Sequence, residues 1–467
     1  MRSYARGTKA VLLKYLAAGV CEAHFCAINV GMQERGMNIK MRILWLCNIM
    51  LPAIAESLGL PYSNREGWLT GIYERMSRDD RKQVELGICF PVERLEGKLK
   101  EQDGRWMLGS TVCYAFEENL NSPEKYDVSM EACFSDILRD FVPDVVHIFG
   151  TEFPHTLAMT RAFGRPQRIL IGIQGLCFAC ADAYMADLPE YVQRRRTFRD
   201  WIKRDGIIEQ KEKFRLRGEY EKQAIRNAGN ITGRTIFDKE ETKKINPHAK
   251  YYHMNETMRS DFYDGKWKRE GSVPHSIFLS QGDYPLKGFH YVLLAMPKIL
   301  SEYPDAIVYV AGNSIIDDRT MKDRIKISSY GKYLKRLIRE YGLKDKVKIL
   351  GKLSAEEMKL QFLKSSLFLC PSSLENSPNS MGEAMLLGVP AVAARAGGIP
   401  SMLEDGTEGL LYDAGNVDKL AEAVLRVWMN PEEAKTRAEA ARKRACRTHN
   451  GDANYERLLE IYREICE

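Results

Sequence analysis

The sequence contains no long hydrophobic run, no internal repeat and no low-complexity tract. No stretch approaches the roughly 18 consecutive apolar residues of a membrane-spanning helix, so we expect no helix to cross a membrane. Neither sign of charge dominates, because the net charge is only +6 over 467 residues. That balance does not indicate nucleic-acid binding. What remains is a globular composition, 45% hydrophobic and 28% charged, and a chain long enough for two domains with separate cores.

Cysteine is not arranged in a recognisable framework. The 11 cysteines are scattered and odd in number, which favours reduced thiols and a cytoplasmic location. Cys177 and Cys180 form a lone Cys-x-x-Cys pair without the second pair that a zinc site would need. The neighbours Leu176, Phe178 and Ala179 are apolar, so core packing is the favoured interpretation and metal binding the alternative.

The first 40 residues differ from the rest of the chain. Basic residues precede an apolar stretch, as in a signal peptide, but Lys14 interrupts that stretch and no small-residue cleavage site follows. The regular strand pattern begins at Met41. We therefore expect residues 1–40 to be a poorly ordered extension.

The most informative segment runs from Leu367 to Pro400. The apolar residues 367–370 predict a buried strand, and a small polar loop follows at 371–379. Residues 380–387 have helical composition, and 389–394 return as a second buried strand. Such a unit belongs to an open parallel sheet, in which ligands bind beyond the carboxyl ends of the strands. We therefore expect a ligand at this loop.

Two glutamates flank the loop, Glu375 and Glu383, with seven residues between them. Small residues let backbone N–H groups approach a ligand, and the helix directs its positive end to the same place, which suits a diphosphate. Glu383, in the first helical turn, could accept hydrogen bonds from a pair of ribose hydroxyls. Gly397 and Gly398 follow the next strand and could add amides. The alternative is that Ser380 and Glu383 form a capping box, and that Glu375 is an ordinary solvated carboxylate.

The same segment resembles the signature of retaining GT-B glycosyltransferases of group 1, glycosyltransferase family four. The residues Glu375, Glu383, Gly397 and Gly398 match the Glu-x7-Glu element and the downstream Gly-Gly loop of that family. Further matches in the C-terminal half are Pro371–Ser373, Glu383-Ala384-Met385, Gly388-x-Pro390 and Gly406-x-x-Gly409-Leu410.

The resemblance implies roles for residues on the donor side. Lys287, followed by Gly288, matches one member of a basic pair that grips the diphosphate, and Gln281 stands where relatives carry the other. Glu375 would hold hydroxyls of the donor sugar and Glu383 those of the ribose. Further donor contacts would come from the loop and first helical turn, at Asn376, Ser377, Asn379 and Ser380.

On the acceptor side the resemblance is weaker. Only Gly67 is present where relatives carry paired glycines, and Gln174-Gly175 replaces the usual His-Gly. Relatives often have a histidine that faces the reacting sugar, and His155 is the candidate for this catalytic role beside Glu375 and Lys287. His147 has apolar neighbours, so the favoured interpretation is a buried structural histidine.

Residues 190–205 mix basic with aromatic and aliphatic side chains. Arginines and lysines surround Phe198, Trp201 and Ile202. That mixture could rest on an anionic membrane surface, where a lipid-linked acceptor would wait, which implies peripheral association with the inner face of the membrane. A solvated helix face is the alternative.

Strand and helix patterns alternate in both halves, which predicts an α/β protein with two doubly wound, Rossmann-like domains facing a cleft. We expect an acceptor-binding domain at 41–265 and a nucleotide-sugar-binding domain at 266–450. The resemblance adds a C-terminal helix, 451–467, that packs back on the first domain.

The resemblance implies transfer of a sugar from a UDP- or GDP-sugar to a glycan or lipid-linked acceptor, with retention, in cell-surface polysaccharide synthesis. It implies no cofactor, and the absence of an Asp-x-Asp motif agrees with a reaction that uses no metal. Two alternatives stay open: a nucleotide-sugar epimerase or hydrolase of the same fold, and a non-catalytic binding protein on a degenerate transferase scaffold.

Overall fold

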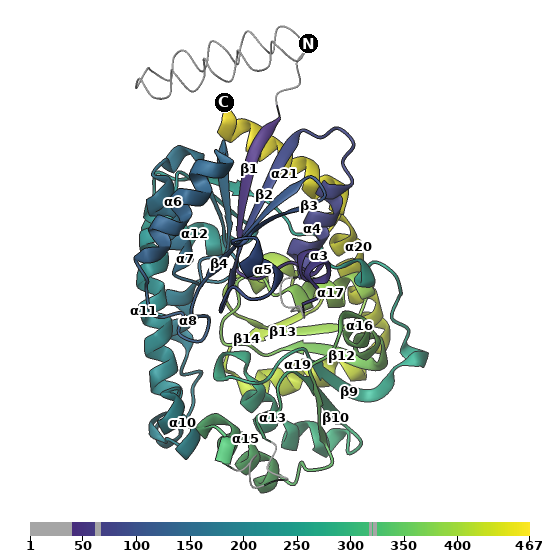
Figure 1. Cartoon of the computed structure of the whole chain (residues 1–467). Coiled ribbons are helices and arrows are strands. Elements are labelled where there is room, and N and C mark those ends of the chain that lie inside the picture. Colours follow the sequence, from purple (N-terminus) through teal and green to yellow (C-terminus); the bar gives the residue numbers. More distant parts are fainter. Residues whose placement is uncertain (1–39, 61–66, 317–319, 321–324) are drawn as a thin grey trace, which may run out of the picture.

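The computed structural model describes residues 40–60, 67–316, 320 and 325–467. They form two α/β domains, one above the other in Figure 1. The extension predicted at residues 1–40 lies, apart from Lys40, outside the described residues. Within the described part of the chain, no helix has both the length and the apolar character needed to cross a lipid bilayer.

The first domain is built on an eight-stranded sheet with the order β3-β4-β2-β1-β5-β6-β7-β8. All neighbouring strands are parallel except β3 and β4. The strands are β1 (Met41–Cys47), β2 (Val84–Val92), β3 (Arg105–Leu108), β4 (Thr111–Glu117), β5 (Val145–Phe149), β6 (Ile169–Gly172), β7 (Asn230–Gly233) and β8 (Lys250–His253). The helices are α3 (Pro52–Leu58), α4 (Gly67–Ser77), α5 (Lys98–Glu101), α6 (Ser129–Phe141), α7 (His155–Phe163), α8 (Cys177–Ala183), α9 (Glu190–Arg194), α10 (Phe198–Lys203), α11 (Ile207–Arg226) and α12 (Ile236–Ile245).

This sheet is covered on both faces, which explains why its central strands are continuous apolar runs. Successive side chains of a strand point to opposite faces. Accordingly, Ile43, Trp45 and Cys47 of β1 belong to one apolar core, and Leu44 and Leu46 to another. The prediction of a doubly wound parallel sheet is therefore confirmed for this domain.

The second domain has a six-stranded, wholly parallel sheet with the order β11-β10-β9-β12-β13-β14. Its strands are β9 (Val273–Leu279), β10 (Ile307–Ala311), β11 (Val347–Gly351), β12 (Ser365–Cys370), β13 (Ala391–Arg395) and β14 (Leu410–Asp413). The helices are α13 (Phe289–Glu302), α15 (Ser329–Glu340), α16 (Ala355–Lys364), α17 (Asn379–Leu387), α18 (Ile399–Met402), α19 (Val417–Met429), α20 (Pro431–Thr448) and α21 (Gly451–Cys466).

Helix α21 crosses back and packs on the first sheet, as expected for the C-terminal helix (Figure 1). The Tyr462 hydroxyl accepts a hydrogen bond from Trp45 Nε1 at 2.8 Å and lies 2.7 Å from His147 Nδ1. His147 is only 1% exposed, and burial lowers its pKa to about 3. The prediction that His147 is a buried structural residue is confirmed.

A second connection runs the other way, from the first domain into the core of the second. We call residues 177–226, which comprise helices α8 to α11, the arm; α11 runs along one side of the molecule in Figure 1. The arm residues Tyr184, Leu188, Val192 and Ile207 belong to the core of the second domain. The arm therefore lies within the first domain by sequence but is held by both domains.

We predict that Tyr462→Phe destabilises the first domain. The substitution leaves the indole N–H of Trp45 buried without an acceptor, and such a group costs about 1–3 kcal/mol. The free energy of unfolding in urea, followed by tryptophan fluorescence, should fall by that amount. Tyr341→Phe, at a tyrosine that is 37% exposed, is the control. Equal stability of the two variants would contradict the prediction.

Candidate active site

The candidate site lies where the order of strands in the second sheet reverses. After β9 the chain continues to β10 on one side, whereas β12 lies on the other side of β9. Ligands of open parallel sheets bind beyond the carboxyl ends of the strands at such a point. The loops that follow β9 and β12 carry Lys287 and Glu375, respectively.

Lys287 and Glu375 meet at the centre of this site. Lys287 Nζ donates to Glu375 Oε1 at 2.6 Å, and Ser372 Oγ donates to the same oxygen at 2.7 Å. The two charged side chains are 19% and 12% exposed. Burial lowers the pKa of Lys287, but Glu375 and Tyr284 outweigh this effect and raise the pKa above its ordinary value. Lys287 is therefore charged at neutral pH, and it lies where we expect the diphosphate to bind.

Gly288 allows the two loops to approach each other closely. Its φ is +69°, and a Cβ there would collide with the carbonyl oxygen of Pro371. The approach is fixed by the Ser373 N–H, which donates to Leu286 O at 2.8 Å. Gln281, at the position where relatives carry a cation, donates to Asp283 Oδ1 at 2.9 Å. Gln281 adds no positive charge to the site.

Gly397 and Gly398 support the loop that contains Glu375. Gly397 has φ +53°, and a Cβ on it would collide with Glu375 O. A Cβ on Gly398 would likewise collide with Asn376 O. The Gly398 N–H donates to Glu375 O at 2.9 Å. This amide is therefore used inside the protein rather than held free for a ligand.

Glu383 is held by an arginine that sequence reasoning did not identify. Arg259 Nη2 donates to Glu383 Oε1 at 2.6 Å, and the side chains are 15% and 7% exposed. Burial raises the pKa of Glu383, although Arg259 opposes the shift. Helix α17 begins at Asn379 with no side-chain cap. The capping-box alternative is therefore wrong, because Glu383 pairs with Arg259 instead of capping its own helix.

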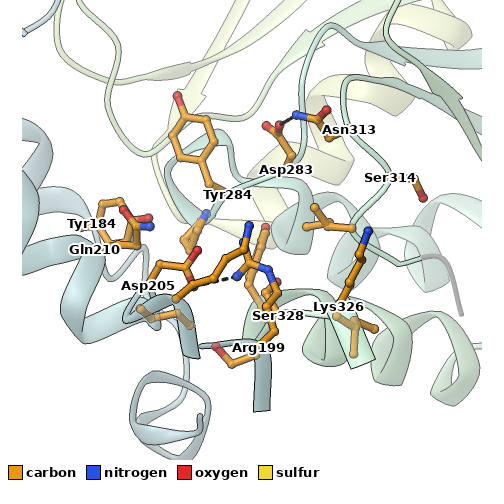
Figure 2. Close-up of a pocket in the computed structure, with 17 residues that line it drawn as sticks. Tyr184, Arg199, Asp205, Gln210, Asp283, Tyr284, Asn313, Ser314, Lys326 and Ser328 are labelled. Atoms are coloured by element: carbon orange, nitrogen blue, oxygen red, sulfur yellow. Dashed lines mark hydrogen bonds and ion pairs between the residues drawn. The ribbon is translucent and has the colours of Figure 1, made fainter. Parts of the chain in front are cut away.

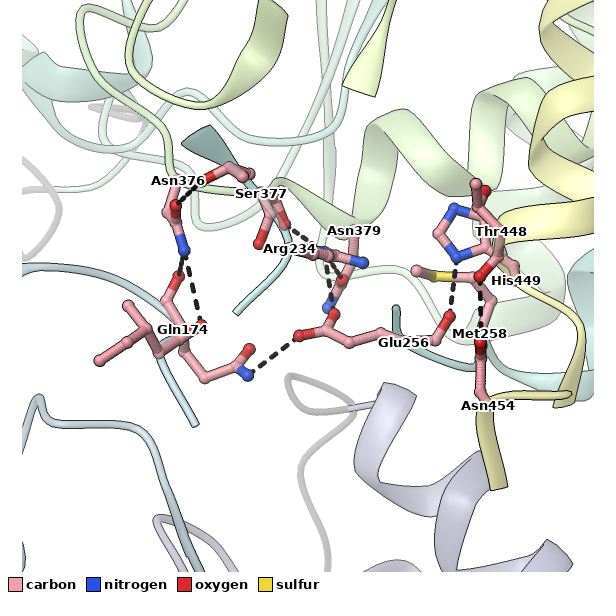
Figure 3. Close-up of polar contacts among 12 residues, drawn as sticks. Gln174, Arg234, Glu256, Met258, Asn376, Ser377, Asn379, Thr448, His449 and Asn454 are labelled. Atoms are coloured by element: carbon pink, nitrogen blue, oxygen red, sulfur yellow. Dashed lines mark hydrogen bonds and ion pairs between the residues drawn. The ribbon is translucent and has the colours of Figure 1, made fainter. Parts of the chain in front are cut away.

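The loop residues Asn376, Ser377 and Asn379 contact the first domain (Figure 3). Arg234, just after β7, donates from Nη2 to Ser377 O at 2.5 Å and to Asn379 Oδ1 at 3.0 Å. Thr235 Oγ1 donates to Asn376 Oδ1 at 2.8 Å. Ser380 lies in the first turn of α17. These contacts fix the loop relative to the first sheet.

Arg234 is itself part of a buried ion pair. Its Nη2 lies 2.8 Å from Glu256 Oε2, and the two side chains are 4% and 8% exposed. Gln174 Nε2 donates to the other Glu256 oxygen at 3.0 Å. Burial lowers the pKa of Arg234 and raises that of Glu256, so the pair carries a desolvation cost. The additional contacts of Arg234 with the loop offset part of that cost.

The remaining acceptor-side candidates lie in the first domain. His155 begins α7 and is wholly buried, with Nδ1 2.7 Å from Glu118 Oε2 and Nε2 2.9 Å from Asn48 Oδ1. Both ring nitrogens of His155 are therefore occupied by protein groups. The Gly175 N–H donates to Glu152 Oε1 at 3.0 Å. Gly67 is the first residue of α4.

Comparison with known proteins identifies the fold. A model of the family described as "Glycosyl transferases group 1" matches residues 264–444, which lie mainly in the second domain. The solved structures that share the architecture include sucrose-phosphate synthase from Thermosynechococcus elongatus, with a TM-score of 0.65 and 14% identity over 91% of this chain and 99% of that one. HepE of Anabaena in complex with UDP-glucose has a TM-score of 0.61 and 16% identity over 91% and 100% of the two chains. The protein therefore has the GT-B fold.

Relatives found by sequence similarity align with less than half of this chain. The putative glycosyltransferase YtcC of Bacillus subtilis is 27% identical over 202 residues, which cover 42% of this chain and 47% of the relative. The amylovoran biosynthesis glycosyltransferase AmsK of Erwinia amylovora is 30% identical over 138 residues, or 28% and 34%. The alignments with these relatives span less than half of their length.

We predict that Arg234→Met both destabilises the protein and loosens the loop at residues 371–379. The change leaves Glu256 buried without its cationic partner, which costs about 3–5 kcal/mol, and it frees the loop at Ser377. The double variant Arg234→Met/Glu256→Gln should regain much of the stability but not the order of the loop, because the loop still lacks its anchor. Thermal unfolding and amide hydrogen exchange of the loop measure the two effects. Recovery of both properties in the double variant would show that Arg234 does not position the loop.

Proposed function

We propose that the protein is a group 1 glycosyltransferase that moves a sugar from a UDP- or GDP-sugar to a glycan or lipid-linked acceptor, with retention. The observation that supports this best is the Lys287–Glu375 pair at the reversal point of a parallel sheet. The match of residues 264–444 to the glycosyltransferase family supports the same reaction class. HepE of Anabaena, which has a similar fold, was solved with UDP and with UDP-glucose, which favours a nucleotide-sugar donor.

The chemical difficulty of this reaction is the charge that develops on the leaving diphosphate. A lysine ammonium has three donors, and Glu375 takes one of those of Lys287. The others are available to phosphate oxygens. Helix α17 begins without a side-chain cap, so its positive end can stabilise the same charge. Pro378 contributes no N–H group, and the donors come from the residues around it. Fixed groups of this kind act where charge appears in the transition state, so no metal ion is required.

The two glutamates would orient the donor. Glu375, fixed by Lys287 and Ser372, would accept hydrogen bonds from hydroxyls of the sugar. Glu383 would accept from the ribose with its carboxylate held by Arg259. We infer front-face attack by the acceptor, in which the leaving phosphate takes the acceptor proton. The new bond then forms on the face that the diphosphate leaves, which retains the configuration.

The first test is release of nucleotide from a panel of UDP-, GDP- and ADP-sugars in the presence of EDTA. We expect turnover of one donor, and a loss of about 100- to 1000-fold in Lys287→Met and in Glu375→Ala, because each removes a group that acts on the developing charge or on the sugar. Lys287→Arg should retain part of the activity, because it keeps the positive charge.

Lys344→Met, at an exposed lysine away from these loops, is the matched control. Product analysis separates the reactions, since an epimerase gives a new nucleotide-sugar and a transferase gives a glycosylated acceptor. Native rates in both Lys287→Met and Glu375→Ala would contradict the assignment. Binding of a donor without turnover in any acceptor mixture would favour a non-catalytic scaffold.

We further propose that helix α10 contacts the inner face of a membrane that carries the acceptor, in keeping with a role in cell-surface polysaccharide synthesis. Phe198, Trp201 and Ile202 are 62%, 67% and 59% exposed. The rings of Phe198 and Trp201 lie stacked, with centroids 6.4 Å apart. The exposed basic residues on and around this helix are Arg194, Arg195, Arg196, Lys203 and Arg204. Aromatic side chains beside basic ones suit the headgroup region of an anionic bilayer.

Vesicle sedimentation tests this contact. The native protein should bind vesicles of phosphatidylglycerol and phosphatidylcholine, and less so at high salt, because the electrostatic part is screened. Phe198→Ser/Trp201→Ser should lose at least tenfold in affinity, whereas Tyr341→Ser, at an exposed tyrosine just after α15, should not. Equal binding by both variants would show that α10 is an ordinary solvated helix.

A further inference from the structure

A cavity of about 590 Å³ lies between the arm and the second domain, beside the candidate site (Figure 2). Its walls come from α10 and α11 on one side and from the segments that follow β9 and β10 on the other. Cavities of about 300–1,000 Å³ hold small ligands. The donor roles assigned above do not use this space.

Three basic side chains and two acidic ones line the cavity, so its lining carries one more positive charge than negative. Arg199 is neutralised by Asp200 and Asp205, whose oxygens lie 3.2 and 2.8 Å from its Nη1. Asp283 accepts hydrogen bonds from Gln281 and Asn313, each at 2.9 Å.

The two lysines on the lining differ from these residues. Within the described part of the chain, neither Lys203 nor Lys326 has an ion-pair partner. An anionic ligand would therefore find two ammonium groups that no described carboxylate neutralises.

The rest of the lining is suited to a polyol. Tyr184 and Tyr330 are 4% and 3% exposed and contribute aromatic surface, and Ile207 adds an apolar wall. The hydroxyl of Tyr330 lies 3.1 Å from His290 Nδ1 and is used inside the protein. Tyr284 lines the cavity and also lies under Lys287, whose Nζ is 5.7 Å from the ring centroid. The Tyr284 side chain would thus lie between a ligand in the cavity and the predicted diphosphate site.

Buried hydrogen bonds join the arm to the second domain beside this cavity. The Asp200 carboxylate, wholly buried, accepts a hydrogen bond from the Thr197 N–H at 3.0 Å and from the Ser329 N–H at 2.9 Å. It therefore caps α10 and α15 together, and α15 belongs to the second domain. His290 Nε2 lies 2.8 Å from Ala186 O, which fixes the arm a second time. These contacts fix the two walls of the cavity relative to each other.

We propose that this cavity binds the phosphate group of a phosphorylated polyol and that this molecule is the acceptor. The identification as the acceptor rests on the proposed function, whereas phosphate binding does not. Lys203 and Lys326 hold the phosphate, and the tyrosines contact the polyol. The phosphate comes either from a lipid headgroup, presented by the exposed face of α10, or from a free sugar or polyol phosphate.

Calorimetric titration of the full chain with glycerol 1-phosphate tests the site directly. We expect Lys203→Gln/Lys326→Gln to weaken binding at least tenfold. Lys268→Gln/Lys344→Gln, which removes the same charge from exposed lysines elsewhere, should bind as the native protein does. Equal weakening in both double variants would reduce the interaction to general electrostatics and overturn the proposal. Displacement of glycerol 1-phosphate by saturating UDP would assign the cavity to the nucleotide and would also overturn it.

Vesicles identify the source of the phosphate. If the soluble compound does not bind, binding to phosphatidylglycerol vesicles that is lost in Lys326→Gln, but not in Lys344→Gln, supports a lipid headgroup. Absence of both interactions overturns the proposal.

Nucleotide release from the donor panel, measured separately on the native protein and on Glu375→Ala, tests the transferase assignment. Failure of the phosphate site and failure of the proposed function are therefore distinguishable.

Discussion

The buried guanidinium of Arg234 is the contact on which the geometry of the site depends. It extends from the end of β7 in the first domain to Ser377 and Asn379 at the start of α17 in the second. A charge in this position is tolerated only if it is paired and hydrogen-bonded, and Glu256 supplies the pairing. The loop cannot move from the first domain without exposing or orphaning that pair. Glu375, two residues before Ser377, is positioned by the same constraint.

Most of the central strands could be predicted from the sequence because a parallel strand buried on both faces is a continuous apolar run. The strand expected at 367–370 is β12, Ser365–Cys370, and the strand pattern expected to begin at Met41 does so, with β1 at Met41–Cys47. Strand β3, Arg105–Leu108, was not predicted. It lies at the edge of the sheet, and its residues alternate between exposed and half-buried positions, so its structure depends on pairing with β4 rather than on its own composition.

Within the site, the sequence predicted the residues that belong to local motifs. It did not predict the arginines that reach the site from distant parts of the chain. Glu375, Glu383 and Lys287 follow strands of one sheet, so their proximity follows from its topology. Arg234 and Arg259 are separated from their loop and helix partners by 143 and 124 residues. Gly-Arg-Thr after a strand was the only local signal for Arg234. Sequence proximity likewise could not show that both nitrogens of His155 are occupied within the first domain.

The arm gives the two domains a second set of contacts, far from the Arg234 pair. At one point of the interface His449 Nδ1, just after α20, lies 2.7 Å from Glu256 O, just after β8 (Figure 3). At the other, Asp200 and Ala186 of the arm are hydrogen-bonded to α15 and α13. Separating the domains would break buried hydrogen bonds at both places, each of which is costly to leave unmade. The family match covers residues 264–444, so the arm lies outside it. The walls that the arm adds lie beside the loop that carries Lys287, since Tyr284 belongs to both.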